Sequence, residues 1–320
     1  MLEIKDLSVR YGKQAPTIEH FNLNMKKGEI ISVVGESGSG KTTVIRAVLG
    51  ALAGGGKVTQ GDILFNGKSL LTNTKDEWRQ LRGTRISMIF QDCGGTLNPI
   101  RKIGSQFVEY ICTHTKVSKD EAWKKGVSML EKMRLPEAEN IMNSYPHQLS
   151  GGMRQRVMIA MALACNPKLL IADEPTTALD VTIQAQILKL MNDLKEKTGT
   201  SIMLITHDLG VVAQMADHVN VMYAGKVVES APVFEIFKNP KHPYTVGLMS
   251  SMPSLNSGSK RLSTIEGNVP NPINLPKGCY FADRCPKAMP KCRESQPHDV
   301  KVGSRHHVSC FLFDDVKGEE

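Results

Sequence analysis

Residues 30–49 read IISVVGESGSGKTTVIRAVL, and this stretch decides the fold. Its first five residues predict a buried strand, and residues 41–49 predict a helix. The turn between them fits the pattern G-x-x-x-x-G-K-[ST], in which glycines let successive backbone N–H groups and the helix N-terminus face an anion. The sequence therefore predicts a phosphate-binding loop, with Lys41 reaching the β and γ phosphates of a nucleotide and Thr42 offering its hydroxyl to Mg²⁺.

Strand and helix patterns alternate up to about residue 230. Further buried strands are predicted at residues 86–90, 169–172 and 201–206, with an amphipathic helix at 181–197. Apolar strands flanked by helices predict an α/β fold with a largely parallel sheet covered on both faces. Two other patterns predict an antiparallel subdomain and a helical insertion: alternating runs at 2–9, 22–25 and 62–65, and a helical run at 103–135.

Two adjacent carboxylates end the apolar run LLIADE, residues 169–174. Asp173 at the strand end can hold the Mg²⁺ shell. Glu174 projects differently and can orient or deprotonate an attacking water molecule. A strand that ends in Asp-Glu is often only a capped loop, but the phosphate-binding loop favours the functional interpretation.

A second anion-binding helix start is predicted at LSGGM, residues 149–153. Ser150 and the N–H groups of Gly151 and Gly152 precede a helix that runs to about Ala164. One γ-phosphate hardly needs two helix N-termini from one chain. We therefore expect this second site to face the nucleotide of another subunit.

These motifs resemble, in type, order and spacing over about residues 1–230, the ATP-binding cassette (ABC) subunits of transporters, which have a P-loop NTPase fold. The matching text is GESGSGKT, LSGGM, LLIADEP, ALD at 178–180 and ITHD at 205–208. In that family two cassettes form a head-to-tail dimer with ATP between the P-loop of one and the LSGG of the other. The resemblance implies an ATPase that closes on binding ATP and opens after hydrolysis.

The resemblance also implies a role for each motif residue. Gln91 would be the Q-loop residue that contacts Mg²⁺ and the transmembrane partner, and His207 the γ-phosphate switch. From pattern alone, a Gln at position 91 is more often merely a solvated strand end, and a His at position 207 is as often a structural residue as a functional one. The implied nucleotide contacts are Tyr11 (stacking on adenine from a loop), Gly35, Ser37, Gly38, Ser39, Gly40, Lys41, Thr42, Thr43, Asp173, Ser150, Gly151, Gly152 and Asp180 (in the D-loop).

After about residue 230 the composition changes, since ten of the 16 prolines lie there. Such a segment is a poor candidate for long helices or central strands, so we expect a loop-rich extension. The predicted organisation is an ABC cassette at 1–230, with a helical subdomain at about 92–165, and an extension at 231–320.

Four cysteines in this extension, Cys279, Cys285, Cys292 and Cys310, have the spacing C-x5-C-x6-C-x17-C. They suggest a structural cluster or metal site, because the extension has too few apolar residues for a core. The residues leave open a [4Fe-4S] cluster, a zinc site that His306 or His307 joins, and unliganded thiols. Here the chain resembles ATP-binding subunits of dipeptide and oligopeptide importers through NPKHPYT at 239–245, and that resemblance implies [4Fe-4S].

Charge and hydropathy limit the function classes. The net charge of +8 includes no run of five like charges, which favours a mildly basic solvated surface over a nucleic-acid-binding arm. No apolar stretch approaches the roughly 18 to 20 residues that cross a bilayer, and the N-terminus lacks a leader-like apolar region. We expect a peripheral protein at the cytoplasmic face of the cell membrane.

The resemblance implies partners: a second cassette subunit, identical or different, two permease chains and an extracellular solute-binding protein. The predicted function is ATP hydrolysis that energises import of dipeptides or oligopeptides. The alternatives are a cassette of a nickel or oligosaccharide importer and a soluble cassette ATPase that acts on nucleic acid. The absence of heptads and of a second cassette counts against the last. A non-enzymatic nucleotide sensor would not require Glu174 and His207.

Overall fold

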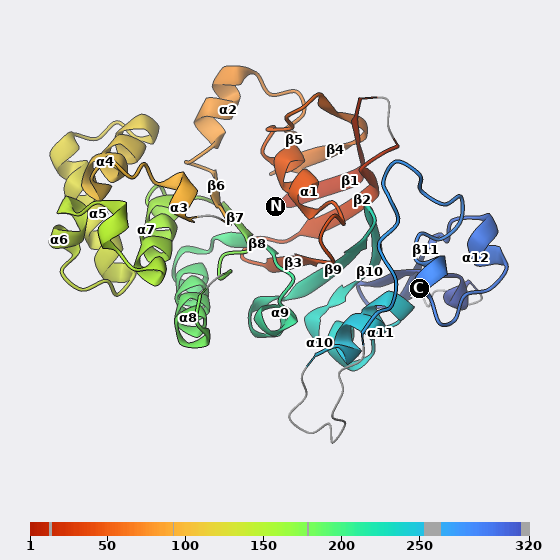
Figure 1. The fold of residues 1–320 in the computed structure, drawn as a ribbon. Coiled ribbons are helices and arrows are strands. Elements are labelled where there is room, and N and C mark those ends of the chain that lie inside the picture. Colours follow the sequence, from red (N-terminus) through yellow and green to blue (C-terminus); the bar gives the residue numbers. More distant parts are fainter. Residues whose placement is uncertain (13–14, 92, 178, 253–263, 315–320) are drawn as a thin grey trace. The chain divides into compact units, whose positions relative to one another are not determined.

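The computed structural model describes residues 1–12, 15–91, 93–177, 179–252 and 264–314. The chain forms two compact units. Figure 1 shows its ribbon coloured by residue number. Unit 1 comprises Met1–Lys26, Ile30–Thr72 and Thr206–Glu320, and unit 2 comprises Lys27–Glu29 and Asn73–Ile205. Each unit is described by itself. In the described part of the chain, no helix is both long and apolar enough to cross a membrane.

Unit 1 contains the antiparallel sheet that the alternating runs predict. Its order is β2-β1-β4-β5, formed by β1 (Leu2–Tyr11), β2 (Ile18–Met25), β4 (Gly56–Phe65) and β5 (Lys68–Ser69). In β2 the side chains of Ile18, Phe21, Leu23 and Met25 are buried and the intervening ones are more exposed, which gives one apolar face. The strands are longer than the sequence patterns indicated, because the alternation weakens toward their ends.

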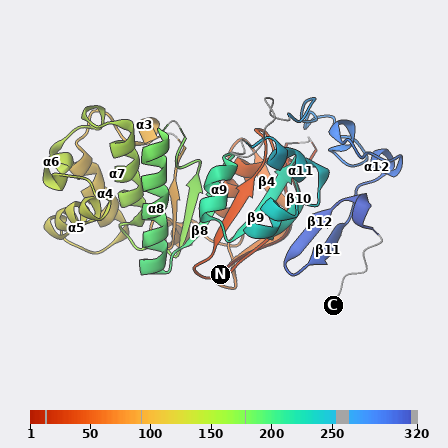
Figure 2. The same cartoon turned by 90° about the horizontal axis from the view of Figure 1, so that it is seen from below.

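The other strands of unit 1 run in the order β11-β12-β10-β9-β3. They are β3 (Ile30–Val34), β9 (His218–Tyr223), β10 (Lys226–Pro232), β11 (Asp299–Gly303) and β12 (His306–Ser309). Strands β3 and β9 are parallel and every one of their residues is buried. Figure 2 shows the hairpin of β11 and β12 near β10. The helices of this unit include α1 (Lys41–Val48), α9 (Leu209–Met215), α10 (Val233–Lys238) and α11 (Pro243–Ser250).

The segment after β10 is only partly loop-rich. Between residues 264 and 298 it contains only one turn of 3-10 helix (Ala282–Arg284) and the short helix α12 (Lys291–Glu294), and another 3-10 turn covers Phe311–Phe313. The β11–β12 hairpin then adds to the sheet by pairing of β12 with β10. The proline count did not predict this hairpin, because residues 298–310 contain no proline although the segment as a whole is rich in it.

Unit 2 contains three parallel strands in the order β8-β7-β6. They are β6 (Ile86–Ile89), β7 (Leu169–Asp173) and β8 (Ser201–Ile205), so the predicted strands are confirmed to within one residue at each end. Helix α8 (Val181–Thr198) follows β7, as its amphipathic pattern predicts. All five residues of β7 and of β8 are buried, as expected of strands covered on both faces.

The other helices described in unit 2 are α2 (Lys75–Leu81), α3 (Cys93–Thr96), α4 (Ile103–His114), α5 (Lys119–Lys132), α6 (Ala138–Asn143) and α7 (Gly151–Leu163). A 3-10 turn (Pro146–Gln148) precedes α7. The run predicted at 103–135 is therefore two helices. Helix α5 starts separately because Ser118 and Glu121 form a capping box.

Candidate functional site

The predicted phosphate-binding loop connects β3 to α1 in unit 1. Gly35 has a φ of 154° and Gly40 a φ of 101°. A Cβ at Gly35 would collide with the carbonyl oxygen of Met222, and one at Gly40 with the side chain of Ile18. Only glycine therefore allows the chain to leave β3 and enter α1 along this path.

Lys41 occupies the inside of this loop. Its Nζ donates hydrogen bonds to the carbonyl oxygens of Gly35 (2.7 Å) and Glu36 (2.9 Å), and the side chain is buried. The backbone carbonyl of Gly40 accepts from the N–H groups of Thr43 (2.9 Å) and Val44 (3.1 Å), which starts the helix. Ser37, Gly38 and Thr42 are exposed, whereas Ser39 and Thr43 are buried. The loop thus presents an ammonium group beside a helix start, which suits a polyphosphate.

Tyr11 and His207 also belong to unit 1. Tyr11 is the last residue of β1, pairs with Gly56 and is half-buried, so its expected placement in a loop is wrong. A Cβ at Gly56 would lie 2.6 Å from the Tyr11 ring, so glycine leaves room for the ring beside β4. His207 is exposed, directly before Asp208, which caps α9 by accepting from the N–H of Gly210 at 2.8 Å.

Glu174 of unit 2 has a carboxylate held by two side-chain donors. Its backbone has a φ of 46° directly after β7, and its N–H donates to the carbonyl of Ile205 at 2.8 Å. Its Oε2 accepts hydrogen bonds from Gln91 Nε2 (2.8 Å) and Thr177 Oγ1 (2.9 Å). The carboxyl ends of β6 and β7 meet at one edge of the sheet, which brings Gln91 to Glu174. Asp173, one residue earlier, is buried.

The LSGGM segment starts α7 as predicted. Ser150 Oγ accepts from the N–H of Met153 at 3.3 Å, and Ser150 and Gly151 are exposed. A Cβ at Gly152 would lie 2.8 Å from Ile183 Cγ2, so this glycine lets α7 approach the start of α8. Asp180 caps α8 by accepting from the N–H of Ile183 at 2.9 Å.

The sequence analysis did not single out two side chains that orient this half of the site. One is Thr177, which hydrogen-bonds Glu174. The other is Gln155, a buried residue of α7 whose Nε2 donates to the carbonyl of Pro175 at 2.5 Å. Its only sequence signal was a polar residue on the apolar face of a predicted helix.

The predicted nucleotide residues therefore divide between the two units. Unit 1 carries Tyr11, the loop from Gly35 to Thr43, and His207. Unit 2 carries Gln91, Ser150, Gly151, Gly152, Asp173, Glu174 and Asp180.

The four cysteines of the extension line one cavity of about 10 Å³ in unit 1, with Phe281 and Phe311 among its other walls. The backbone N–H of Cys279 donates to the carbonyl of Cys292 at 2.8 Å. Burial raises the pKa of the Cys279 and Cys285 thiols and raises the pKa of Cys310 to about 11. No group of three or more His, Cys, Asp or Glu side chains within the described ranges is placed so that it could hold a metal ion.

Neither histidine considered for a mixed zinc site lines this cavity. His306 Nε2 hydrogen-bonds the buried Glu229 carboxylate at 2.8 Å, and His307 Nδ1 hydrogen-bonds Asp299 at 2.9 Å. Each ring therefore has one nitrogen engaged by a carboxylate.

Comparison with known proteins assigns the family. Residues 18–177 match the family model described as ABC transporter, and residues 228–292 match the model described as Oligopeptide/dipeptide transporter, C-terminal region. The chain belongs to the ABC transporter family. The oligopeptide transport ATP-binding protein AppD of Bacillus subtilis is 48% identical over 100% of this chain and 99% of its own length. Two oligopeptide transport ATP-binding proteins named OppD are also similar. That of Bacillus subtilis is 50% identical over 98% of this chain and 89% of its own length. That of Salmonella typhimurium is 48% identical over 97% of this chain and 93% of its own length.

Solved structures of ABC cassettes share the fold. The dimeric structure of MJ0796, a bacterial ABC transporter cassette, aligns with a TM-score of 0.65 at 29% identity, over 73% of this chain and 99% of that one. CbiO1 from Clostridium perfringens, part of the ABC transporter complex cbiONQ, aligns with a TM-score of 0.66 at 30% identity, over 77% and 94%. The predicted P-loop NTPase fold of the ABC type is therefore confirmed.

Proposed function

We propose that this ABC protein is the ATP-hydrolysing subunit that energises import of oligopeptides or dipeptides through a membrane transporter. The observation that carries the proposal is the match at 228–292 to the C-terminal region of oligopeptide/dipeptide transporters, which lies outside the residues matched by the ABC transporter model. The full-length similarity to oligopeptide transport ATP-binding proteins supports the same substrate class.

Phosphoryl transfer requires positioning and charge neutralisation. Lys41, inside its loop, is suited to bind the β and γ phosphates of ATP. Mg²⁺ bound with ATP supplies charge neutralisation at the transferred group. The oxygen donors Thr42 and Asp173, with the amide of Gln91, are the ligand types that Mg²⁺ prefers, and we propose them as its protein ligands.

We propose Glu174 as the residue that orients and deprotonates the attacking water. Its hydrogen bonds with Gln91 and Thr177 restrain the carboxylate, which suits a group that holds a water molecule in one orientation. His207, exposed before the cap of α9, is proposed as the γ-phosphate sensor. Tyr11 is proposed to stack on adenine.

A second cassette subunit, identical or different, would complete the site. Ser150, Gly151, Gly152 and Asp180 are exposed or half-buried at helix starts, and we propose that they contact the nucleotide held by the P-loop of the partner. The dimeric structure of MJ0796 supports such pairing. Two permease chains, an extracellular solute-binding protein and a peripheral place on the cytoplasmic face of the cell membrane belong to the same proposal, whereas nucleic acid does not.

We further propose a division into a cassette at 1–230, with a helical subdomain at about 92–165, and an extension at 231–320 that binds a [4Fe-4S] cluster. Four cysteines around one cavity match the ligand number of such a cluster, and their thiols would have to move together to ligate iron, because no described group of His, Cys, Asp or Glu side chains is placed to hold a metal ion. The thiols whose pKa burial raises would have to lose their protons on binding iron, so occupancy should increase with pH.

Uptake of labelled oligopeptides into vesicles that contain the reconstituted complex tests the function. We expect ATP-dependent peptide accumulation that unlabelled dipeptides and oligopeptides reduce. Inhibition by nickel or oligosaccharides but not by peptides would assign the other solute class.

A further inference from the structure

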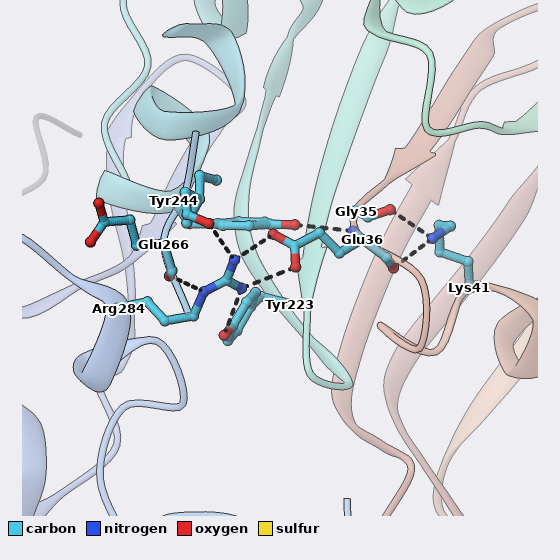
Figure 3. Close-up of polar contacts among 8 residues, drawn as sticks. Gly35, Glu36, Lys41, Tyr223, Tyr244, Glu266 and Arg284 are labelled. Atoms are coloured by element: carbon cyan, nitrogen blue, oxygen red, sulfur yellow. Dashed lines mark hydrogen bonds and ion pairs between the residues drawn. The ribbon is translucent and has the colours of Figure 1, made fainter. Parts of the chain in front are cut away.

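Glu36, the second residue of the phosphate-binding loop, is held by a residue 248 positions away. Arg284 donates from Nη1 to Glu36 Oε2 at 3.0 Å and from Nη2 to Glu36 Oε1 at 3.1 Å, a two-pronged pair that Figure 3 shows. The Arg284 side chain is 6% exposed and that of Glu36 29% exposed. A paired guanidinium and carboxylate in this geometry form a strong and directional contact.

A second residue from beyond β10 holds the backbone of Glu36. The N–H of Glu36 donates to Tyr244 Oη at 3.0 Å, and Tyr244 is fully buried in α11. The carbonyl of Glu36 accepts from Lys41 Nζ at 2.9 Å. One loop residue thus joins the extension, through its N–H and its carboxylate, to the ammonium proposed to bind phosphate.

Arg284 is itself held in a fixed position. Its Nε donates to the carbonyl of Glu266 at 2.9 Å, and its Nη1 also donates to Tyr223 Oη at 3.2 Å. The rings of Tyr223, Tyr244 and Phe281 contact one another with centroids 4.8 to 5.3 Å apart. This packing leaves the guanidinium little freedom, so its position determines that of Glu36.

Charge explains why such a contact is needed. A carboxylate in a loop that binds a polyphosphate repels the ligand unless a positive charge neutralises the carboxylate. The guanidinium of Arg284 neutralises Glu36 and so removes this repulsion. The same contact helps to fix the Glu36 carbonyl that accepts from Lys41.

We propose that Arg284 is a positioning residue for the ATP site, which acts through Glu36 and makes nucleotide affinity depend on the C-terminal extension. The inference rests on the proposed function, because it requires the loop to bind ATP.

Equilibrium binding of Mg-ATP to the full-length chain and steady-state hydrolysis by the complex test this role. We expect Arg284→Met to raise the Kd for ATP about tenfold, as removal of one partner of a largely buried charge pair leaves the other uncompensated. The kcat at saturating ATP should stay within about twofold, because Arg284 acts on binding and not on the proposed catalytic carboxylate.

A double-mutant cycle separates this mechanism from a loss of folding. Arg284→Met combined with Glu36→Gln should recover most of the affinity, because no carboxylate then remains to repel the phosphates. Arg284→Lys, which keeps the charge but loses the two-pronged geometry, should be intermediate. Arg293→Met is the matched control. Arg293 also belongs to the extension, but its ion pair there is with the exposed Asp283, at 2.5 Å.

The outcomes distinguish the two proposals. If the wild-type chain does not bind Mg-ATP, the proposed function fails. If the wild type binds Mg-ATP, a folded Arg284→Met with wild-type affinity would show that the positioning role is wrong. Arg284→Lys and the double variant would then also have wild-type affinity. If Arg284→Met does not fold, Arg284→Lys decides. An affinity of Arg284→Lys for Mg-ATP equal to that of the wild type would overturn the positioning role. An affinity about two- to threefold weaker, restored when Glu36→Gln is added, would support the role.

Discussion

Gln91 Nε2 donates to Glu174 Oε2 at 2.8 Å, although 83 residues separate the two. The amide follows β6 and the carboxylate follows β7, and the parallel pairing of these strands brings them together. The hydrogen bonds from Gln91 and from Thr177 both end on Oε2 of Glu174 and so restrain this carboxylate. This geometry makes the proposed roles of both residues testable.

Glu174→Gln should lower the kcat for ATP hydrolysis at least about 100-fold, since it removes the group proposed to accept the proton of the attacking water. The isosteric amide keeps the contacts with Thr177, so ATP binding should persist and a nucleotide-bound dimer should accumulate. Phosphate release and size-exclusion chromatography with Mg-ATP measure both effects. Hydrolysis at the wild-type rate would remove Glu174 from its role.

Gln91→Ala should lower kcat by about tenfold and change the Kd for ATP less, because Glu174 loses a side-chain donor but keeps its charge, while Thr42 and Asp173 remain as proposed Mg²⁺ ligands. Gln80→Ala, at an exposed position of α2 in the same unit, is the matched control and should change neither value. A rise in Kd without a fall in kcat would mean that Gln91 serves binding alone.

Protein purified without oxygen should contain about four iron and four sulfide per chain and absorb visible light as a brown solution. Cys285→Ser should reduce both contents, because Cys285 lines the cavity shared by all four cysteines. Cys112→Ser, on α4, should not. Stoichiometric zinc without sulfide would contradict the cluster.

Local pattern predicted the elements that are apolar throughout, but it could not predict how distant elements meet. β3, β7 and β8 were recognisable because each is a short apolar run. The Ser118 capping box marked the start of α5, yet the long helical run concealed it. The β11–β12 hairpin has no apolar run of its own, since its strands read DVKVG and HHVS, and the neighbouring prolines dominated the composition.

The site shows the same division. The glycines, Lys41, Asp173 and Glu174 belong to contiguous motifs and could be identified from sequence. The partners that hold this part of the chain could not be identified from sequence. Arg284 binds Glu36 from 248 positions away, and Gln155 donates to the carbonyl of Pro175 from a different element. Such contacts depend on the tertiary fold, which leaves no periodic trace in the sequence. Their physical sign is a polar side chain that becomes buried on folding.

Glu229 offers a pH-dependent test of how the extension is attached. Its fully buried carboxylate accepts from the N–H groups of Lys241 and His242, each at 2.8 Å, and from His306 Nε2 at 2.8 Å. Burial raises the pKa of Glu229, but these hydrogen bonds together outweigh it and hold the pKa below the ordinary 4.5. A carboxyl whose folded pKa is lowered stabilises the fold above its ordinary pKa, and this stabilisation is lost as the pH falls through the folded value.

Glu229→Gln should therefore lower the free energy of unfolding by about 2 to 4 kcal/mol at pH 7, because one amide oxygen cannot serve three donors. The difference from the wild type should shrink as the pH falls below 4.5, where the wild-type carboxyl itself takes up a proton. Urea denaturation at pH 7 and at successive lower values measures it, with Glu294→Gln at an exposed position of α12 as the control. A difference that is constant with pH would show that the charge of Glu229 does not stabilise this attachment.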